Sequence, residues 1–159
     1  MKPQVSFRFA KPQDAELVLR FIRALADYEH LLDEVVATPQ LLQEWLFEKK
    51  AAEVLFVLKD GKEAGYALFF HNFSTFLGRA GIYLEDLFVL PEYRHQGLGK
   101  ALLKELARLT AERGCGRLEW ACLNWNRPSI EFYLACGAVP MEEWTTYRLA
   151  GAALEAMAK

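Results

Sequence analysis

The sequence predicts an α/β protein built on one mixed β-sheet that is flanked by helices. Some segments show the alternation of apolar and polar residues that is typical of strands. Between them lie segments in which apolar residues recur every three or four positions, as in helices. Near the middle of the chain, a strand-like run meets a helix-like run across a short loop with two glycines. A chain of 159 residues can bury a core of its own, so we expect residues 1–159 to form a single domain.

The first elements follow from periodicity and capping. Apolar residues at every second position predict a strand at 5–9. Apolar residues at steps of four and three predict a helix at about 14–29. A second helix is expected to extend to about residue 49, because Thr38 is a good N-cap and Pro39 costs little in a first helical turn.

The middle of the chain predicts three strands in succession. Runs rich in β-branched and aromatic residues lie at 53–58 and 65–70, and the Asp60-Gly61 pair between them is a hairpin signal. Residues 71–80 are expected to form an irregular loop, and 81–90 to form the central strand. Strands joined this closely pair antiparallel.

The remaining elements alternate between helix and strand. After the glycines we expect a helix at 98–112, a strand at 118–123 and a short helix at 128–137. Residues 138–149 are expected to form a hairpin or two short strands, and the alanine-rich end at 150–158 a weak helix or a frayed tail. The helix between the central strand and the strand at 118–123 predicts that these two strands run parallel.

Composition narrows the class of protein. The net charge of −2 argues against a surface that coats nucleic acid, and no apolar run reaches the length of a membrane span. The start, Met1-Lys2-Pro3-Gln4, lacks the apolar core of a signal peptide, so a cytoplasmic location is expected. The three cysteines form no CxxC pair and the three histidines have no metal-binding spacing, so we expect neither a disulfide framework nor a metal site.

The segment Arg-His-Gln-Gly-Leu-Gly-Lys-Ala at residues 94–101, called the glycine loop here, has the pattern of an anion site. The first N–H groups of a helix lack intrahelical partners, and glycine lets a bulky anion approach them. Arg94 and Ala101 stand where a Walker A loop needs glycine and serine or threonine, and the third glycine of a dinucleotide fingerprint is absent. What remains is Arg-x-x-Gly-x-Gly between a strand and a helix.

Together with its surroundings, this loop resembles the acetyl-CoA pyrophosphate loop of the GCN5-related N-acetyltransferases, the GNAT superfamily. Residues 83–89, 93–99 and 125–133 (Trp-Asn-Arg-Pro-Ser-Ile-Glu-Phe-Tyr), with Ala-Asp-Tyr-Glu at 26–29, resemble the spermidine/spermine (diamine) and thialysine acetyltransferase branch. The resemblance covers nearly the whole chain and is most specific over residues 83–137. It implies the GNAT fold, in which a central parallel strand pair lies within the mixed sheet.

The resemblance also implies which residues bind acetyl-CoA, the acetyl donor. The backbone of the glycine loop would hold the pyrophosphate, and the end of the central strand would pair with the pantetheine arm as a further strand would. Solvent-exposed surface positions are the alternative for Arg94, Lys100 and Arg127. The implied cofactor-binding residues are Leu87, Phe88, Val89, Arg94, His95, Gln96, Gly97, Leu98, Gly99, Lys100, Asn126, Arg127, Ser129 and Tyr133.

Two residues are expected to carry the chemistry. The resemblance assigns Tyr133 as the general acid that protonates the departing sulfur, and a half-buried core aromatic is the alternative for this residue. Glu85 and Asp86 are adjacent carboxylates in an apolar strand, where burial without a partner is costly. The resemblance favours Glu85 as the base for the protonated amine. The choice between Glu85 and Asp86 stays open.

The amine is expected to meet acidic and aromatic residues. Asp27, Glu29, Asp33 and Glu34 form an acidic run, which is either a solvated helix end or an acidic mouth that attracts a cation. Tyr28 and Trp125 could pack along a methylene chain or offer a cation–π face. The expected substrate-binding residues are Tyr28, Glu29, Glu85, Asp86 and Trp125.

These observations predict an N-acetyltransferase for a small polyamine, diamine or thialysine-like amine. The resemblance implies a homodimer, and neither nucleic acid nor a membrane is expected as a partner. Two alternatives stay open: a protein N-acetyltransferase for N-terminal or lysine amines, and an acyl-CoA-binding regulatory module without turnover.

Overall fold

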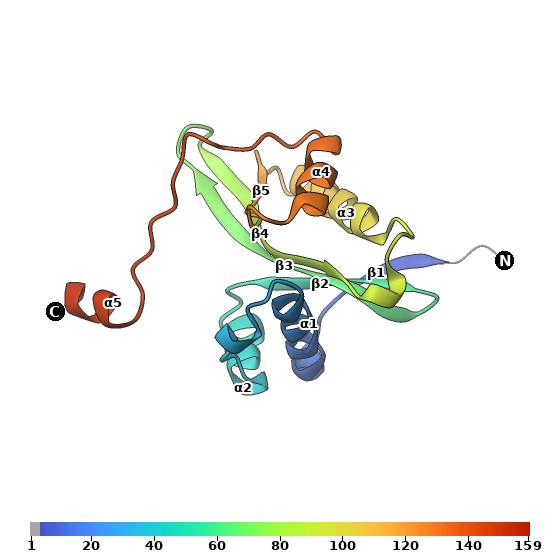
Figure 1. Cartoon of the computed structure of the whole chain (residues 1–159), viewed down its shortest axis with the longest axis horizontal. Coiled ribbons are helices and arrows are strands. Elements are labelled where there is room, and N and C mark those ends of the chain that lie inside the picture. The colour runs from blue at the N-terminus through green and yellow to red at the C-terminus, as the bar shows by residue number, and fades with distance from the viewer. Residues whose placement is uncertain (1–3) are drawn as a thin grey trace. The chain divides into compact units, whose positions relative to one another are not determined.

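The computed structural model describes residues 4–159, so Met1 to Pro3, on which the expectation of no signal peptide partly rests, lie outside it. The structure divides into two compact units, residues 1–121 and residues 122–159, and each is described by itself. A single domain therefore stays a prediction. Figure 1 labels the elements. In the first unit they are β1 (Val5–Phe9), α1 (Ala15–Tyr28), α2 (Pro39–Leu42), β2 (Glu53–Lys59), β3 (Lys62–Ser74), β4 (Arg79–Val89), α3 (Leu98–Glu112) and β5 (Leu118–Trp120).

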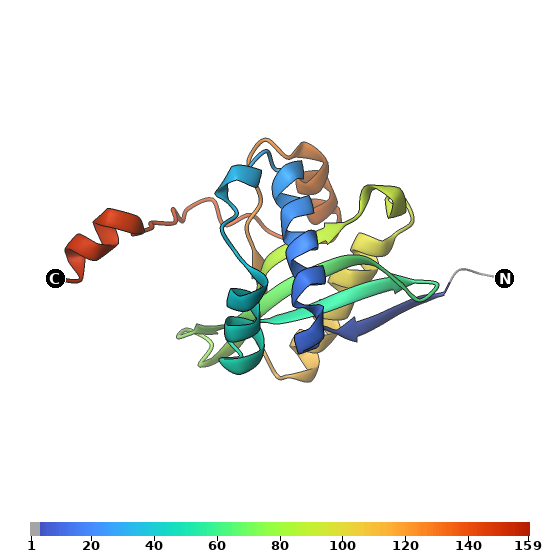
Figure 2. The same ribbon diagram turned by 90° about the horizontal axis from the view of Figure 1, so that it is seen from below.

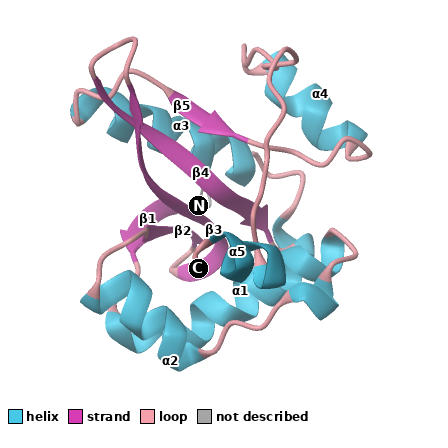
Figure 3. Cartoon of the chain, turned by 90° about the vertical axis from the view of Figure 1, so that its left-hand side faces the viewer, coloured by secondary structure: helices cyan, strands magenta, loops and turns pink. Residues whose placement is uncertain are grey.

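The sheet is mixed, as the sequence predicts. Its strand order is β1-β2-β3-β4-β5, and the first four strands pair antiparallel in sequence order. β5 returns after α3 and pairs parallel with β4 from Ile82 to Leu84, and it lies beside β4 in Figure 3. The predicted strand at 118–123 is shorter in the structure, because it ends at Trp120.

One face of the sheet carries a hydrophobic core that includes residues of α1, β2, β3 and β4. α1 and α2 cover this face (Figure 1), and Figure 2 shows α1 lying across the strands. The ring of Phe21 lies 5.7 Å from that of Phe56 on β2 and 5.2 Å from that of Tyr66 on β3. All three side chains are at most 3 % exposed. Burial of one such aromatic ring stabilises a fold by roughly 2 kcal/mol, so these contacts fix α1 on the sheet.

α3 covers the opposite face (Figure 1). Its apolar stripe is buried, with Leu102 and Leu106 fully enclosed. The helix begins after Gly97, whose φ of 77° is left-handed, and ends before Gly114, whose φ is 71°. These glycines set both ends of the predicted helix at 98–112 because other residues rarely adopt that backbone conformation.

One expectation for the first unit is wrong, and another is confirmed with a difference in the type of helix. The irregular loop expected at 71–80 is mostly strand: β3 continues to Ser74, β4 starts at Arg79, and a tight turn closed by Leu77 N–H to Ser74 Oγ (3.1 Å) joins them. The second expected helix reaches Glu48, close to the predicted end at about residue 49, but only Pro39–Leu42 is α-helical and Gln43–Glu48 winds as a π-helix. Thr38 caps this helix as predicted, accepting from the N–H of Leu41.

The second unit holds α4 (Arg127–Ala135) and α5 (Gly151–Met157). The strands expected at 138–149 are absent, since the described residues there form neither helix nor strand. Val139, Trp144 and Tyr147 in this segment are at least 72 % exposed. A hairpin is marginal without a further strand or helix to pack on, and this stretch has no strand partner in the part of the chain described here.

Candidate active site

β4 contains a bulge at Glu85. Leu84 pairs with Phe69 and Asp86 pairs with Leu68, so Glu85 has no partner residue of its own on β3. An extra residue of this kind bends the strand and shifts the alternation of its side chains. Glu85 and Asp86 therefore do not divide simply between the two faces, as regular alternation would require.

Beyond this bulge, one edge of β4 has no neighbouring strand. The parallel pairing with β5 stops at Leu84 and Trp120, and among the described residues no strand pairs with 85–89 on that side. Backbone groups at such an edge can pair with an extended ligand. Leu87 and Val89, two of the predicted cofactor contacts, lie on this stretch.

The glycine loop leads from the end of β4 into α3. The first backbone hydrogen bond of α3 runs from Ala101 N–H to Gly97 O (3.0 Å), so the N–H groups of Leu98, Gly99 and Lys100 have no intrahelical acceptor. A Cβ at Gly99 would meet nothing closer than Val89 Cγ2, at 3.8 Å. The absent side chain thus leaves room in front of these N–H groups, and the helix dipole favours an anion there.

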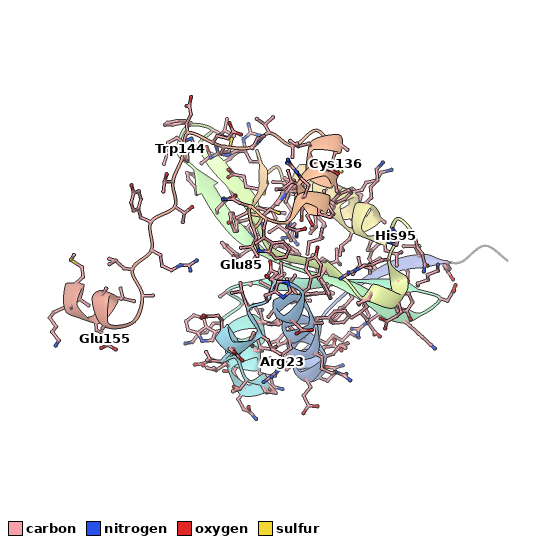
Figure 4. The ribbon with its side chains drawn as sticks, in the orientation of Figure 1. Arg23, Glu85, His95, Cys136, Trp144 and Glu155 are labelled. Carbon is pink, nitrogen blue, oxygen red and sulfur yellow. The ribbon has the colours of Figure 1, made fainter. Side chains whose placement is uncertain are left out.

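Two side chains of the glycine loop contact other parts of the first unit, and a third is exposed. The Arg94 guanidinium carbon lies 5.0 Å from the ring centre of Tyr28 and 5.1 Å from that of Phe88, and Arg94 Nε donates to Val89 O (3.1 Å). Gln96 accepts a hydrogen bond from Lys59 Nζ. His95, labelled in Figure 4, has a left-handed φ of 62° and an exposed side chain. A phosphate contact by Arg94 stays a prediction, and its observed role is to join the loop to α1.

Asp86 is held by a buried tyrosine. Tyr66 Oη donates to Asp86 Oδ2 across 2.6 Å. Burial raises the pKa of the Asp86 carboxyl, this hydrogen bond lowers it, and the negative charge of Glu85 raises it further, with a net increase. Burial and the nearby carboxylates raise the pKa of Tyr66 well above its usual range, so Tyr66 stays protonated as a donor.

Glu29, Glu85 and Asp86 form one acidic group, called the carboxylate cluster here. The charges of all three raise the pKa of the Tyr66 phenol, and burial together with the charge of Asp86 raises the pKa of Glu29. Within residues 4–159, none of the three forms an ion pair with lysine, arginine or histidine. Glu85, labelled in Figure 4, is the exposed member of the cluster.

Tyr28 and Phe88 form the aromatic part of the same region. Tyr28 ends α1, and its ring centre lies 6.1 Å from that of Phe88 on β4. Glu29, the next residue, is the C-cap of α1. The first unit thus brings the end of α1 together with the bulged half of β4 and the start of the glycine loop, which both lie far from α1 in the sequence.

The other predicted residues belong to the second unit. Asn126 caps α4, its side chain accepting from Ser129 N–H (3.4 Å), and Tyr133 follows Ser129 by four residues on this helix. The predicted short helix is therefore confirmed, with Ser129 and Tyr133 one turn apart. Trp125 and Arg127 are exposed. The cofactor and catalytic roles of these residues stay predictions.

Two classes of feature are absent from the described residues. No group of three or more His, Cys, Asp or Glu side chains is arranged to hold a metal ion. None of the helices described combines the length and the apolar composition of a membrane span.

The residues of the first unit fit a nucleotide thioester and a cation. The glycine loop offers N–H donors and open space to a pyrophosphate, and the edge of β4 offers backbone groups to an extended arm. The carboxylate cluster next to that edge provides negative charge, and no lysine, arginine or histidine within residues 4–159 forms an ion pair with it. Sequence analysis predicted each of these groups. It missed Tyr66, although a tyrosine in an apolar strand indicates a buried hydroxyl that requires a hydrogen-bond partner.

Comparisons with known proteins identify the family of this chain. The family model "Acetyltransferase (GNAT) family" matches residues 19–138, a range that spans parts of both units. The thialysine N-epsilon-acetyltransferase of Bos taurus is 36% identical over 166 residues, covering 97% of each chain. The L-ornithine N5-acetyltransferase NATA1 of Arabidopsis thaliana is 43% identical over 102 residues, covering 64% of this chain and 45% of that protein.

A solved structure matches over almost the full length. An integron cassette protein from the mobile metagenome of V. cholerae superposes with a TM-score of 0.81 and 28% identity, covering 98% of each chain. The fold, the matched range of the family model and the identity to a thialysine acetyltransferase lead to the same conclusion. The chain belongs to the GNAT family of acetyltransferases and is an acetyl-transferring enzyme.

Proposed function

We propose that this enzyme transfers the acetyl group of acetyl-CoA to a primary amine of a small polyamine, diamine or thialysine-like substrate. The observation that carries the proposal is the carboxylate cluster: three carboxylates beside the open edge of β4, with no ion pair among residues 4–159. A cationic substrate would neutralise this cluster. Thialysine and ornithine, the substrates in the names of two relatives, each carry a terminal amine and an α-amine.

The proposed donor site uses the glycine loop and the end of β4. Acetyl-CoA supplies the acetyl thioester. The N–H groups at the start of α3 bind its pyrophosphate, and the backbone at Leu87–Val89 aligns its extended arm. Asn126, Ser129 and Arg127 of the second unit are proposed as further contacts to the same molecule.

Two side chains are proposed to move protons. Glu85, exposed at the bulge, accepts a proton from the substrate ammonium directly or through a water, since only the neutral amine can attack the thioester. Tyr133 donates a proton to the departing sulfur. Asp86 is proposed to bind the substrate rather than to act as the base, because it is less exposed than Glu85 and is already held by Tyr66.

We also propose a homodimer. Exposed aromatic and aliphatic side chains occur at the tip of the β3–β4 hairpin, where Phe76 is 90% exposed, and in the second unit, where Tyr147 is 91% exposed. Large apolar side chains that a fold leaves exposed often mark an interface, and each unit by itself carries such residues. Sedimentation equilibrium should give twice the 18.2 kDa mass of the chain, and a monomer at micromolar concentration would contradict the dimer.

The function is tested by direct detection of free CoA, for example by chromatography, with acetyl-CoA and a panel of amines. The panel contains spermidine, spermine, putrescine, thialysine, ornithine, lysine and a lysine-containing peptide. Thiol reagents alone are unsuitable, because the chain has three free cysteines of its own. Saturable turnover of a small amine supports the proposal. Turnover of the peptide alone would favour a protein acetyltransferase, and CoA binding without any turnover would favour a regulatory module.

A further inference from the structure

Tyr66 lies at the base of the carboxylate cluster. Its side chain on β3 is fully buried, and its ring packs against Phe21 of α1 with centres 5.2 Å apart. A phenol enclosed in this way has little freedom to reorient, and its hydroxyl needs an acceptor to offset the loss of water. The acceptor is Asp86 Oδ2, at 2.6 Å.

The bulge at Glu85 makes this hydrogen bond possible. Tyr66 pairs with Phe88, and Asp86 precedes Phe88 by two residues, so Asp86 and Tyr66 are diagonal neighbours on one face of the sheet. Without the extra residue, the register that pairs Leu84 with Phe69 would place Asp86 opposite Ala67 and on the other face, which α3 covers. The bulge turns the Asp86 carboxylate toward the Tyr66 hydroxyl and away from the core beneath α3.

In the pair of Tyr66 and Asp86, the phenol is the hydrogen-bond donor and the carboxylate is the acceptor. A phenol next to three carboxylates keeps its proton, and a distance of 2.6 Å is typical of a hydroxyl that donates to an ionised carboxylate. The bond engages Oδ2 alone. In the described part of the chain, Tyr66 is the one hydrogen-bond donor to Asp86, so Oδ1 keeps its capacity to accept from a ligand.

We propose that Tyr66 is a positioning residue of the amine site: its hydroxyl holds Oδ2 of Asp86 from within the core, so that Oδ1 is fixed in place to accept a hydrogen bond from the substrate ammonium. This inference rests on the proposed function, since it assigns Asp86 the role of substrate ligand. The titratable groups that face Asp86 are Glu85 on β4, Tyr66 on β3 and Glu29 at the end of α1. Two of these are anionic, so the Tyr66 hydroxyl is the group that favours the ionised form of Asp86.

The test is the substitution Tyr66→Phe, which removes the hydroxyl and keeps the ring. Loss of one hydrogen bond to a charged group corresponds to about a tenfold change. We expect the KM for a diamine to rise about tenfold with kcat within about twofold of wild type. The acidic limb of the kcat/KM profile should move to higher pH, because the pKa of Asp86 rises when its donor is lost. Tyr83→Phe is the matched control, since Tyr83 is a phenol on β4, close to Glu85, that donates no hydrogen bond to the cluster.

A double-mutant cycle separates positioning from a general structural role. If Tyr66 acts through Asp86, Tyr66→Phe should change KM no further in an Asp86→Asn background. An unchanged KM in the single variant, or an equal rise in both backgrounds, would overturn the inference. Titration of the Asp86 carboxyl by ¹³C NMR needs no turnover: it should shift to higher pH in Tyr66→Phe, and an unmoved titration would also overturn the inference. If the wild type acetylates no small amine, the proposed function fails, while this titration still decides whether Tyr66 controls Asp86.

Discussion

Gly99→Ala should strengthen the fold and weaken binding of CoA at the same time. Gly99 is in the first turn of α3 and does not have a left-handed φ, and its added methyl would meet only Val89 Cγ2, at an ordinary 3.8 Å. Alanine is favoured over glycine in a helix by about 0.5–1 kcal/mol. We expect about 0.5 kcal/mol of added stability for a residue in the first turn, or a rise in Tm of roughly 1–2 °C.

The same methyl group occupies the space that the glycine loop leaves for a pyrophosphate. If it displaces even one N–H contact to phosphate, the loss is about 1.5–3 kcal/mol, since hydrogen bonds to charged groups lie in that range. The Kd for CoA should therefore rise at least about tenfold. Titration calorimetry with CoA measures this effect, and thermal unfolding without ligand measures the change in stability.

Gly114→Ala is the matched control at the other end of α3. Gly114 has a left-handed φ of 71°, so alanine should destabilise the fold by about 1 kcal/mol without a steric clash. Its distance from the loop is about 22 Å along a 15-residue helix, so CoA binding should not change. A folded Gly99→Ala variant that binds CoA with wild-type affinity would refute the assignment of the glycine loop as the phosphate site.

Three further predictions concern acid–base groups. Glu85→Gln should lower kcat/KM at pH 7 by roughly 10²-fold and shift the pH–rate profile toward alkaline pH, and an unaltered profile would argue against Glu85 as the base. Tyr133→Phe should lower kcat by roughly 10²-fold, and unchanged turnover would remove Tyr133 from the mechanism. Asp86→Asn should raise the free energy of unfolding at neutral pH while it weakens amine binding, as measured by urea unfolding and KM. A carboxyl whose pKa is raised by folding binds protons more readily in the folded state, so stability falls as pH rises through the folded pKa. The gain in Asp86→Asn should therefore disappear at acidic pH, where Asp86 is protonated, and a gain that persists there would contradict this account.

Local signals predicted part of the site well. The start of α3 at the glycines, its end at Gly114 and the Thr38 cap depend on single residues and their immediate neighbours, and the structure confirms them. The adjacent carboxylates Glu85 and Asp86 also stood out, because charges rarely occur within apolar strands.

The arrangement of those carboxylates depends on pairing between strands, which local patterns do not determine. The bulge exists only in the register of β4 against β3, so the sequence did not predict that Asp86 shares a face with Tyr66. The extension of β3 to Ser74 was not predicted for a similar reason. The polar residues His71 and Asn72 interrupt the alternating pattern of a strand, but pairing with β4 stabilises the strand there. At 138–149 the reverse occurred: the sequence predicted strands, but within the described chain no strand pairs with this segment and none forms.

The central claim is that the carboxylate cluster binds the acceptor through its positive charge, so an acceptor with two ammonium groups should be preferred over one with a single ammonium group. The direct measurement is the ratio of kcat/KM for a linear diamine to that for a monoamine of equal length, at pH 7 and low salt. We predict a ratio of at least about tenfold, which falls with added salt and in Glu29→Gln. A ratio close to one, independent of salt and of Glu29, would contradict the claim that these carboxylates select the acceptor.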